Sequence, residues 1–181
     1  QMLMKVMETS AKQLLMAGVT TEVDLGAPLA DSLAIRDRIR KGEVVGPRVF
    51  VSGPWIAHLS AAAAGDAMQV GFGGINTSTP AEAAQQAERL AAAGVDHIKA
   101  HSGLGFEDYK AIVAVARRHQ IKVHAHVYAE QDVRNALEAG VDVLQHAGSA
   151  GTAPPYTPEL IRDIVNAGRP VVVTAAHRSW V

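Results

Sequence analysis

The stretch Lys122–His146, KVHAHVYAEQDVRNALEAGVDVLQH, decides the fold of this chain. It reads as an apolar strand that ends at His126, a helix that Gly140 stops, and a second strand that ends at His146. A strand–helix–strand unit joins parallel strands, so the two strand ends lie side by side at one edge of a sheet. Folds of the α/β class place their active sites at that edge. We therefore expect the two histidines to lie together in a functional site.

The same alternation of helix and strand extends over the whole chain. No two consecutive strands are joined by a tight hairpin, which favours a parallel sheet. A (β/α)8 barrel needs about 250 residues and eight strands. We therefore expect residues 1–181 to be part of a single catalytic barrel domain with about six of the eight βα units, the first and last strands lying outside. Strands are expected at 19–24, 48–52, 95–100, 121–127, 141–146 and 170–174, and helices at 2–17, 29–41, 79–93, 106–119, 130–139 and 158–167.

A six-stranded open sheet is the alternative architecture. A barrel segment that lacks two strands exposes sheet edges and core, so such a segment should be unstable alone. Residues 53–79 are expected to form a long loop, either an active-site lid or a plain surface loop, and residues 148–158 a second loop beside the pocket. A basic run in the second helix is expected to form a solvent-exposed face; it comprises Arg36, Arg38, Arg40 and Lys41.

Composition excludes several classes of function. The formal net charge is −1 and no basic stripe is present, so a nucleic-acid partner is not expected. The sequence contains no apolar run of about 18 residues, so it predicts no membrane-spanning helix. Cysteine is absent, which removes disulfides and thiolate metal sites but does not fix the compartment. The first residue is Gln1 and no signal peptide is visible. The sequence leaves open whether the protein forms a homo-oligomer.

Three residues at strand ends form a candidate metal site. Lys99 ends the buried strand VDHIK, where a lysine is unusual without a task or a partner. His126 and His146 end the next two strands, and histidine is a common metal ligand. His124 shares a strand face with His126, so at most one of them is expected to be the principal ligand. The other would contact substrate, support the ligand or line the barrel.

The remaining histidines are weaker candidates. His177 follows the last strand and could contact substrate, although a role without substrate contact is as well supported. His119 is expected at a helix C-terminus, where a cation is favourable in any case. His97 shares a face with Lys99 but lies deeper. His58 and His101 carry no stronger signal.

Four segments together resemble the amidohydrolase superfamily, most closely its imidazolonepropionase-like and prolidase-type metal-dependent hydrolases. They are AGVTTEVDLG (17–26), KGEVVGPRVFVSG (41–53), AGVDHIKAHSG (93–103) and VHAHVYAEQDVRNALEAGVDVLQHAG (123–148). The resemblance covers nearly the whole chain, and its last two segments are the most specific. It implies a (β/α)8 barrel with one or two divalent metal ions, commonly Zn²⁺.

The resemblance also implies roles for individual residues. Lys99 matches the strand-4 lysine that is carboxylated and bridges two metals in the family. His126 matches the strand-5 ligand rather than His124, because the interval of 20 residues to His146 is typical of the family. His146 matches the strand-6 ligand. Tyr128 resembles a position that helps to hold the substrate carboxylate.

The implied reaction is hydrolysis of an amide or cyclic-amide C–N bond by a metal-activated water. A dipeptide, an N-acyl amino acid and an imidazolone-like ring all fit as small-molecule substrates. The chain departs from the family pattern in lacking the first-strand His-x-His pair and the strand-8 aspartate, which are expected before residue 1 and after residue 181. The function is therefore that of the larger protein.

Two rival hypotheses stay open from sequence. AGVDHIKAHSG is also similar to a strand of deoxyribose-phosphate aldolases, in which a lysine attacks a carbonyl as a Schiff base. That reading makes no use of His126 or His146. The other rival is a catalytically inactive barrel segment that acts as a binding module.

Overall fold

The computed structural model describes residues 2–59, 74–147 and 156–174. Helices and strands alternate along the described chain as expected, except between residues 48 and 76, where three strands follow one another. The elements are α1 (Met2–Met16), β1 (Thr21–Asp24), α2 (Leu29–Arg40), β2 (Arg48–Val51), β3 (Ile56–Ala57), β4 (Ile75–Asn76), α5 (Pro80–Ala92), β5 (His97–Ala100), α6 (Phe106–Arg118), β6 (Lys122–His126), α7 (Glu130–Glu138), β7 (Val143–Gln145), α8 (Pro158–Ala167) and β8 (Val171–Val172).

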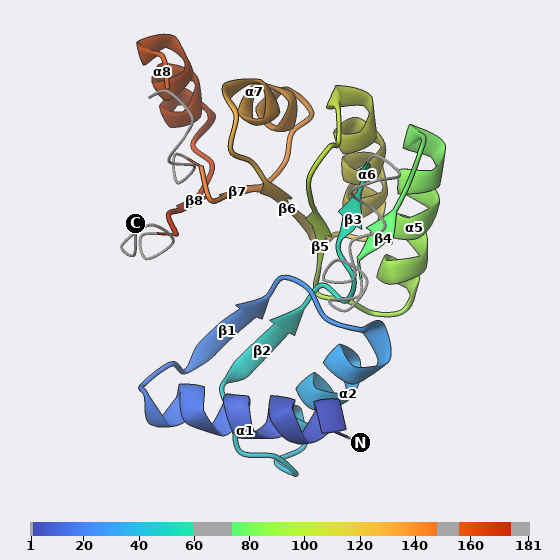
Figure 1. Cartoon of the computed structure of the whole chain (residues 1–181), viewed down its shortest axis with the longest axis vertical. Coiled ribbons are helices and arrows are strands. Elements are labelled where there is room, and N and C mark those ends of the chain that lie inside the picture. Colours follow the sequence, from blue (N-terminus) through green and yellow to red (C-terminus); the bar gives the residue numbers. More distant parts are fainter. Residues whose placement is uncertain (1, 60–73, 148–155, 175–181) are drawn as a thin grey trace.

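All strand pairs are parallel, and they follow an arc with helices outside it (Figure 1). One sheet has the order β1-β2 and the other the order β4-β3-β5-β6-β7-β8. The two sheets meet at Val51 and Asp96, where the Asp96 N–H donates to the Val51 carbonyl at 2.8 Å. The prediction of a parallel α/β fold with the strands of a partial barrel is confirmed.

The segment 53–79 differs from the expectation of an uninterrupted loop, because β3 and β4 lie within it. The Ile75 N–H donates to the Trp55 carbonyl and the Thr77 N–H to the Ala57 carbonyl, both at 2.8 Å. Both strands are two residues long and neither lies in a β-branched run such as PVVVT at 170–174, which is why the sequence did not reveal them. Residues 60–73, and 148–155 of the second expected loop, lie outside the described residues.

The expectation of a wholly exposed basic face on α2 is wrong for Arg36, which is only 7% exposed. Its Nη1 donates to the Gly94 carbonyl at 2.7 Å and to Asp96 Oδ2 at 3.0 Å. The same Asp96 oxygen accepts the Val51 N–H at 2.9 Å. Burial raises the pKa of Asp96, but these hydrogen bonds outweigh it and hold the pKa below its ordinary value. Arg36 and Asp96 thus tie α2 to the junction of the two sheets.

The core lies between the strands and the helices of the outer layer. One face of each central strand is fully buried against α5, α6 and α7, because side chains alternate along a strand. This face carries Ile98 and Ala100 of β5, Val123 and Ala125 of β6, and Leu144 of β7. The alternate residues of the same strands therefore face the inner side of the arc.

The helices within the described ranges include none that is both long and apolar enough to cross a membrane.

Candidate active site

Strand alternation brings Lys99 and His126 to the inner face of the sheet. Lys99 lies between Ile98 and Ala100, which both face the helices, and His126 follows Ala125 in the same way. Both residues lie in the C-terminal halves of neighbouring strands, where barrel enzymes place reactive groups. The geometry therefore places them at one end of the sheet, as the sequence predicted.

His146 reaches the same place by a different route. It directly follows Gln145, whose side chain already lies on the inner face beside His124. Regular alternation would send the next side chain to the opposite face. Instead His146 has a φ of 65°, a left-handed conformation that few non-glycine residues adopt. This local strain accompanies a side chain that lies beside His126, with ring centroids 4.8 Å apart.

These residues line a cavity of about 460 Å³. Four of the residues singled out from sequence contribute to it, namely Lys99, His126, His146 and Tyr128. The Tyr128 ring packs edge-on against His126 with centroids 4.5 Å apart, and its backbone carbonyl accepts a hydrogen bond from the Tyr156 hydroxyl at 2.8 Å. The remaining wall consists of Asp24, Leu25, Gly26, Trp55 and His101.

The Lys99 side chain is buried, with 2% of the residue exposed. Its Nζ has no hydrogen-bond partner within the described part of the chain. Burial lowers the pKa of Lys99 to about 7, because the charged ammonium loses its hydration. A large share of the lysine is therefore a neutral amine near pH 7, which can act as a nucleophile.

His146 is oriented by a neighbouring hydroxyl. Its Nδ1 forms a hydrogen bond with Oγ1 of Thr174, just beyond β8. Because Thr174 engages Nδ1, the other ring nitrogen, Nε2, is the one that could bind a metal. This arrangement is common around ligating histidines. The structure thus supplies an orienting group for one of the expected ligands.

His124 lies deeper than the cavity of Lys99. Its Nδ1 contacts Nε2 of Gln145 at 3.0 Å, and its ring packs against His97 with centroids 4.6 Å apart. His97 and His124 line a separate space of about 350 Å³. A substrate-binding role for His124 stays a prediction that this placement does not favour. His177 lies outside the described residues.

Sequence reasoning underrated His101 and did not single out Trp55. His101 is two positions beyond Lys99, so alternation alone could have placed both on one face. It stacks on His126 with centroids 4.1 Å apart and on Trp55 at 4.4 Å. Trp55 had no such signal, because it lies in the segment expected to be a loop.

Lys99, His126 and His146 fit a metal ion only if further ligands also bind it. Nowhere in the described ranges do three His, Cys, Asp or Glu side chains gather closely enough to hold a metal by themselves. Lys99, whose buried Nζ has no partner among the described residues, lines the same cavity as His126 and His146. Imidazole nitrogens are common ligands of divalent cations.

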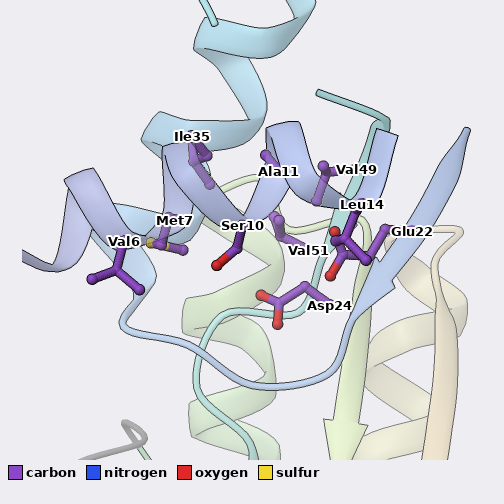
Figure 2. A pocket seen from close by; sticks show the side chains of 10 residues that line it. All are labelled: Val6, Met7, Ser10, Ala11, Leu14, Glu22, Asp24, Ile35, Val49 and Val51. Atoms are coloured by element: carbon purple, nitrogen blue, oxygen red, sulfur yellow. The ribbon is translucent and has the colours of Figure 1, made fainter. Parts of the chain in front are cut away.

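A second cavity, of about 200 Å³, lies between α1 and the strands β1 and β2 (Figure 2). Glu22 and Asp24 of β1 lie opposite Ser10 of α1, among apolar side chains. Burial raises the pKa of both carboxyl groups. This cavity contains none of the expected metal ligands.

Solved structures similar to this chain share its fold. A Bifidobacterium longum protein assigned as a prolidase is 29% identical, with a TM-score of 0.70 over 87% of this chain and 39% of its own. Molinate hydrolase is 25% identical, with a TM-score of 0.74 over 94% of this chain and 44% of its own. The A. niger ochratoxinase is 19% identical and matches the fold with a TM-score of 0.77, over 94% and 44%.

The chain thus spans less than half the length of these structures. No curated protein sequence matches it significantly. The sequence profile of the amidohydrolase family matches residues 1–180. The chain therefore belongs to the amidohydrolase family.

Proposed function

We propose that the full-length protein is a metal-dependent hydrolase that cleaves an amide or cyclic-amide C–N bond, with Lys99, His126 and His146 as metal ligands. The observation that carries this proposal is the buried Lys99 amine, which has no partner in the described structure and shares a cavity with the two histidines. The family supports hydrolysis of a C–N bond as the reaction class. The similar structures include a protein assigned as a prolidase and molinate hydrolase.

The chemistry of Lys99 suits carboxylation. Because its pKa is about 7, the neutral amine is available to attack carbon dioxide. Attack forms an N–C bond as one C=O π bond of carbon dioxide breaks, and the nitrogen releases a proton. The product is a carbamate whose single negative charge is shared by its two oxygens. The carbamate would bind one or two divalent cations, Zn²⁺ being the first candidate, together with His126 and His146. A bound cation would supply an activated water as the nucleophile and would polarise the scissile carbonyl.

Other residues of this chain position the ligands and the substrate. Thr174 holds Nδ1 of His146, and the Tyr128 ring lies against both histidines, at 4.5 Å from His126 and 5.7 Å from His146. The Tyr128 hydroxyl would bind a substrate carboxylate or amide oxygen. Leu25 and Trp55 form the apolar part of the cavity wall, which limits water around the reacting bond.

The test compares Lys99→Ala with Lys110→Ala in the full-length protein. Lys110 is an exposed lysine of α6 and serves as the matched control. Dipeptides, N-acyl amino acids and cyclic amides form the substrate panel. We expect Lys99→Ala to reduce bound metal and to lower kcat/KM at least about a hundredfold, while Lys110→Ala keeps both. Wild-type activity that survives exhaustive chelation, or a fully active Lys99→Ala variant, would disprove the proposal.

The same lowered pKa also suits a Schiff-base lysine, the rival hypothesis from sequence. Borohydride reduction in the presence of an aldehyde separates the two. Covalent trapping on Lys99 together with metal-independent activity would favour the aldolase. The cavity contact between His126 and His146 favours the hydrolase, because a Schiff base needs neither histidine.

A further inference from the structure

Three aromatic rings form a column that ends on one of the proposed metal ligands. Trp55 stacks on His101 with ring centroids 4.4 Å apart and planes 30° from parallel. His101 stacks in turn on His126 at 4.1 Å and 21°. All three rings line the 460 Å³ cavity. We call Trp55, His101 and His126 the ring column.

Backbone contacts between neighbouring strands fix the ring column. The His101 N–H donates to the Ile56 carbonyl at 2.7 Å, directly after Trp55. Ile56 also pairs with Ala100 of β5, and Ala100 with Ala125 of β6, the residue before His126. The backbone segments that carry the three rings are therefore hydrogen-bonded to one another as neighbouring strands.

Two glycines leave room for the outer end of the column. A Cβ on Gly74 would lie 2.3 Å from the Trp55 six-membered ring, and a Cβ on Gly26 would lie 2.6 Å from its five-membered ring. Because backbone approaches the indole this closely at two points, Trp55 has little freedom to shift away from His101. The residue is only 8% exposed.

The inner end of the column is equally confined. His126 contacts the face of His101 and packs edge-on against Tyr128 at 4.5 Å and His146 at 4.8 Å. A turn of the His126 ring about its side-chain bonds would collide with the stacked His101 ring. We propose that Trp55 and His101 are positioning residues that fix the plane of the His126 imidazole and so strengthen metal binding. This inference rests on the proposed metal centre.

His101 acts in this account through its ring face and not as a ligand. The lone pair of an imidazole nitrogen lies in the plane of the ring. The planes of His101 and His126 are only 21° from parallel, so their lone pairs run side by side and do not converge on one ion. A phenyl ring at position 101 should therefore replace the imidazole, whereas an aliphatic side chain should not.

The test measures Co²⁺ binding to the full-length protein by its visible absorption and by competition with a chelator. The variants are His101→Phe, His101→Leu and Trp55→Leu, with His119→Leu as control because His119 pairs with Glu88 on α5. His101→Phe and the control should keep the Co²⁺ Kd within about twofold. His101→Leu and Trp55→Leu should weaken it about three- to tenfold and alter the Co²⁺ spectrum, the range expected for a lost ring contact beside a ligand.

Each other outcome overturns the inference. His101→Leu with wild-type Kd and spectrum would show that the stack does not position the ligand, even if the variant melts at a lower temperature. His101→Phe as weak as His101→Leu would show that the nitrogen matters instead of the ring face. A wild-type protein that binds no Co²⁺ would overturn the proposed function itself. Wild-type binding with an unaffected His101→Leu would overturn this inference alone.

Discussion

His146 shows how much a single backbone angle contributes to the site. Its φ of 65° turns the side chain to the cavity at a position where strand alternation would send it to the helices. Contacts of the His146 side chain with His126, Tyr128 and the Thr174 hydroxyl compensate this strain. The orientation of this proposed ligand therefore depends on its neighbours as well as on its own strand.

Thr174→Val tests that dependence. The substitution keeps the shape of the side chain but removes the hydroxyl that holds Nδ1 of His146. We expect metal affinity to fall about tenfold, the lower end of the effect seen when a partner of a ligating histidine is removed. Thr9→Val on the exposed face of α1 is the control. Equal metal affinity in both variants, measured by chelator competition, would contradict the role of Thr174.

Sequence reasoning could bring the proposed site residues together better than it could orient them. Lys99 was recognisable because a lysine ending a buried strand is unusual, and His126 because of its spacing from His146. The cavity brings these three together with Tyr128. The left-handed backbone at His146 has no sequence signature, since a histidine rarely adopts it. Trp55 was not predictable because its partners, Gly26 and Gly74, are distant in sequence.

At the scale of elements, one hydrogen-bonding arrangement occurs twice. In each copy an aspartate follows Ala-Gly-Val and directly precedes a strand. It accepts an N–H from the neighbouring strand and binds an arginine that also donates to the glycine carbonyl. The first copy is Arg36 with Asp96 and Gly94. The second is Arg117 with Asp142 and Gly140. The repeated motif thus joins a helix, a helix–strand turn and two strands.

Arg36→Met should destabilise the protein more than Arg40→Met. Arg36 is buried, whereas the Arg40 side chain is 48% exposed although it binds the other oxygen of Asp96 at 3.0 Å. Loss of a buried partner should lower the free energy of unfolding by about 2–3 kcal/mol, and loss of the exposed one by under about 1 kcal/mol. Urea titration of the full-length variants measures both. Equal losses would mean that burial does not strengthen this pair.

The sequence could not predict this arrangement from its basic run. Arg36, Arg38 and Arg40 look alike on a helix, and only the tertiary fold brings Asp96 to one side of α2. The helices expected at 79–93 and 130–139 and the strands expected after them are present as α5, β5, α7 and β7. Asp96 and Asp142, which directly precede these two strands, were not recognised as ties, because their partners lie in another helix and another strand.

At the scale of the whole molecule, the inner side of the arc carries buried neutral histidines. Burial lowers the pKa of His97 to about 4 and that of His124 to about 3. A histidine in the unfolded chain titrates near 6.5, so on acidification the unfolded state takes up protons before the folded state does. Their contribution to stability is complete above pH 6.5 and is lost as the pH falls toward about 4 for His97 and about 3 for His124.

This predicts acid sensitivity that depends on His97. Between pH 7 and pH 5 the His97 contribution should fall by about 2 kcal/mol. His97→Phe keeps a ring in the same space without a titrating group, so the metal-free variant should lose correspondingly less stability over this range. Urea titrations at the two pH values check this. A wild-type and a variant protein with identical pH dependence would contradict the assignment of His97 as a buried neutral ring.

The architecture was the most predictable feature of all. Periodic helices and β-branched strands, most of them bounded by glycine or proline, indicated six parallel strands, and all six are present. What the pattern missed were β3 and β4, which are two residues long and, unlike β8, lie in no β-branched run. The similar structures are more than twice as long as this chain, so the remaining ligands of a complete centre are expected from the full-length protein.

The central claim is that Lys99, His126 and His146 bind a catalytic metal, and anomalous X-ray diffraction from crystals of the full-length protein, collected on both sides of the zinc absorption edge, tests it most directly. The account predicts an anomalous peak in the cavity, with His126 and His146 nitrogens and a carboxylated Lys99 as its ligands. A metal bound elsewhere, or an active protein with an unmodified Lys99 and no peak in this cavity, would contradict it.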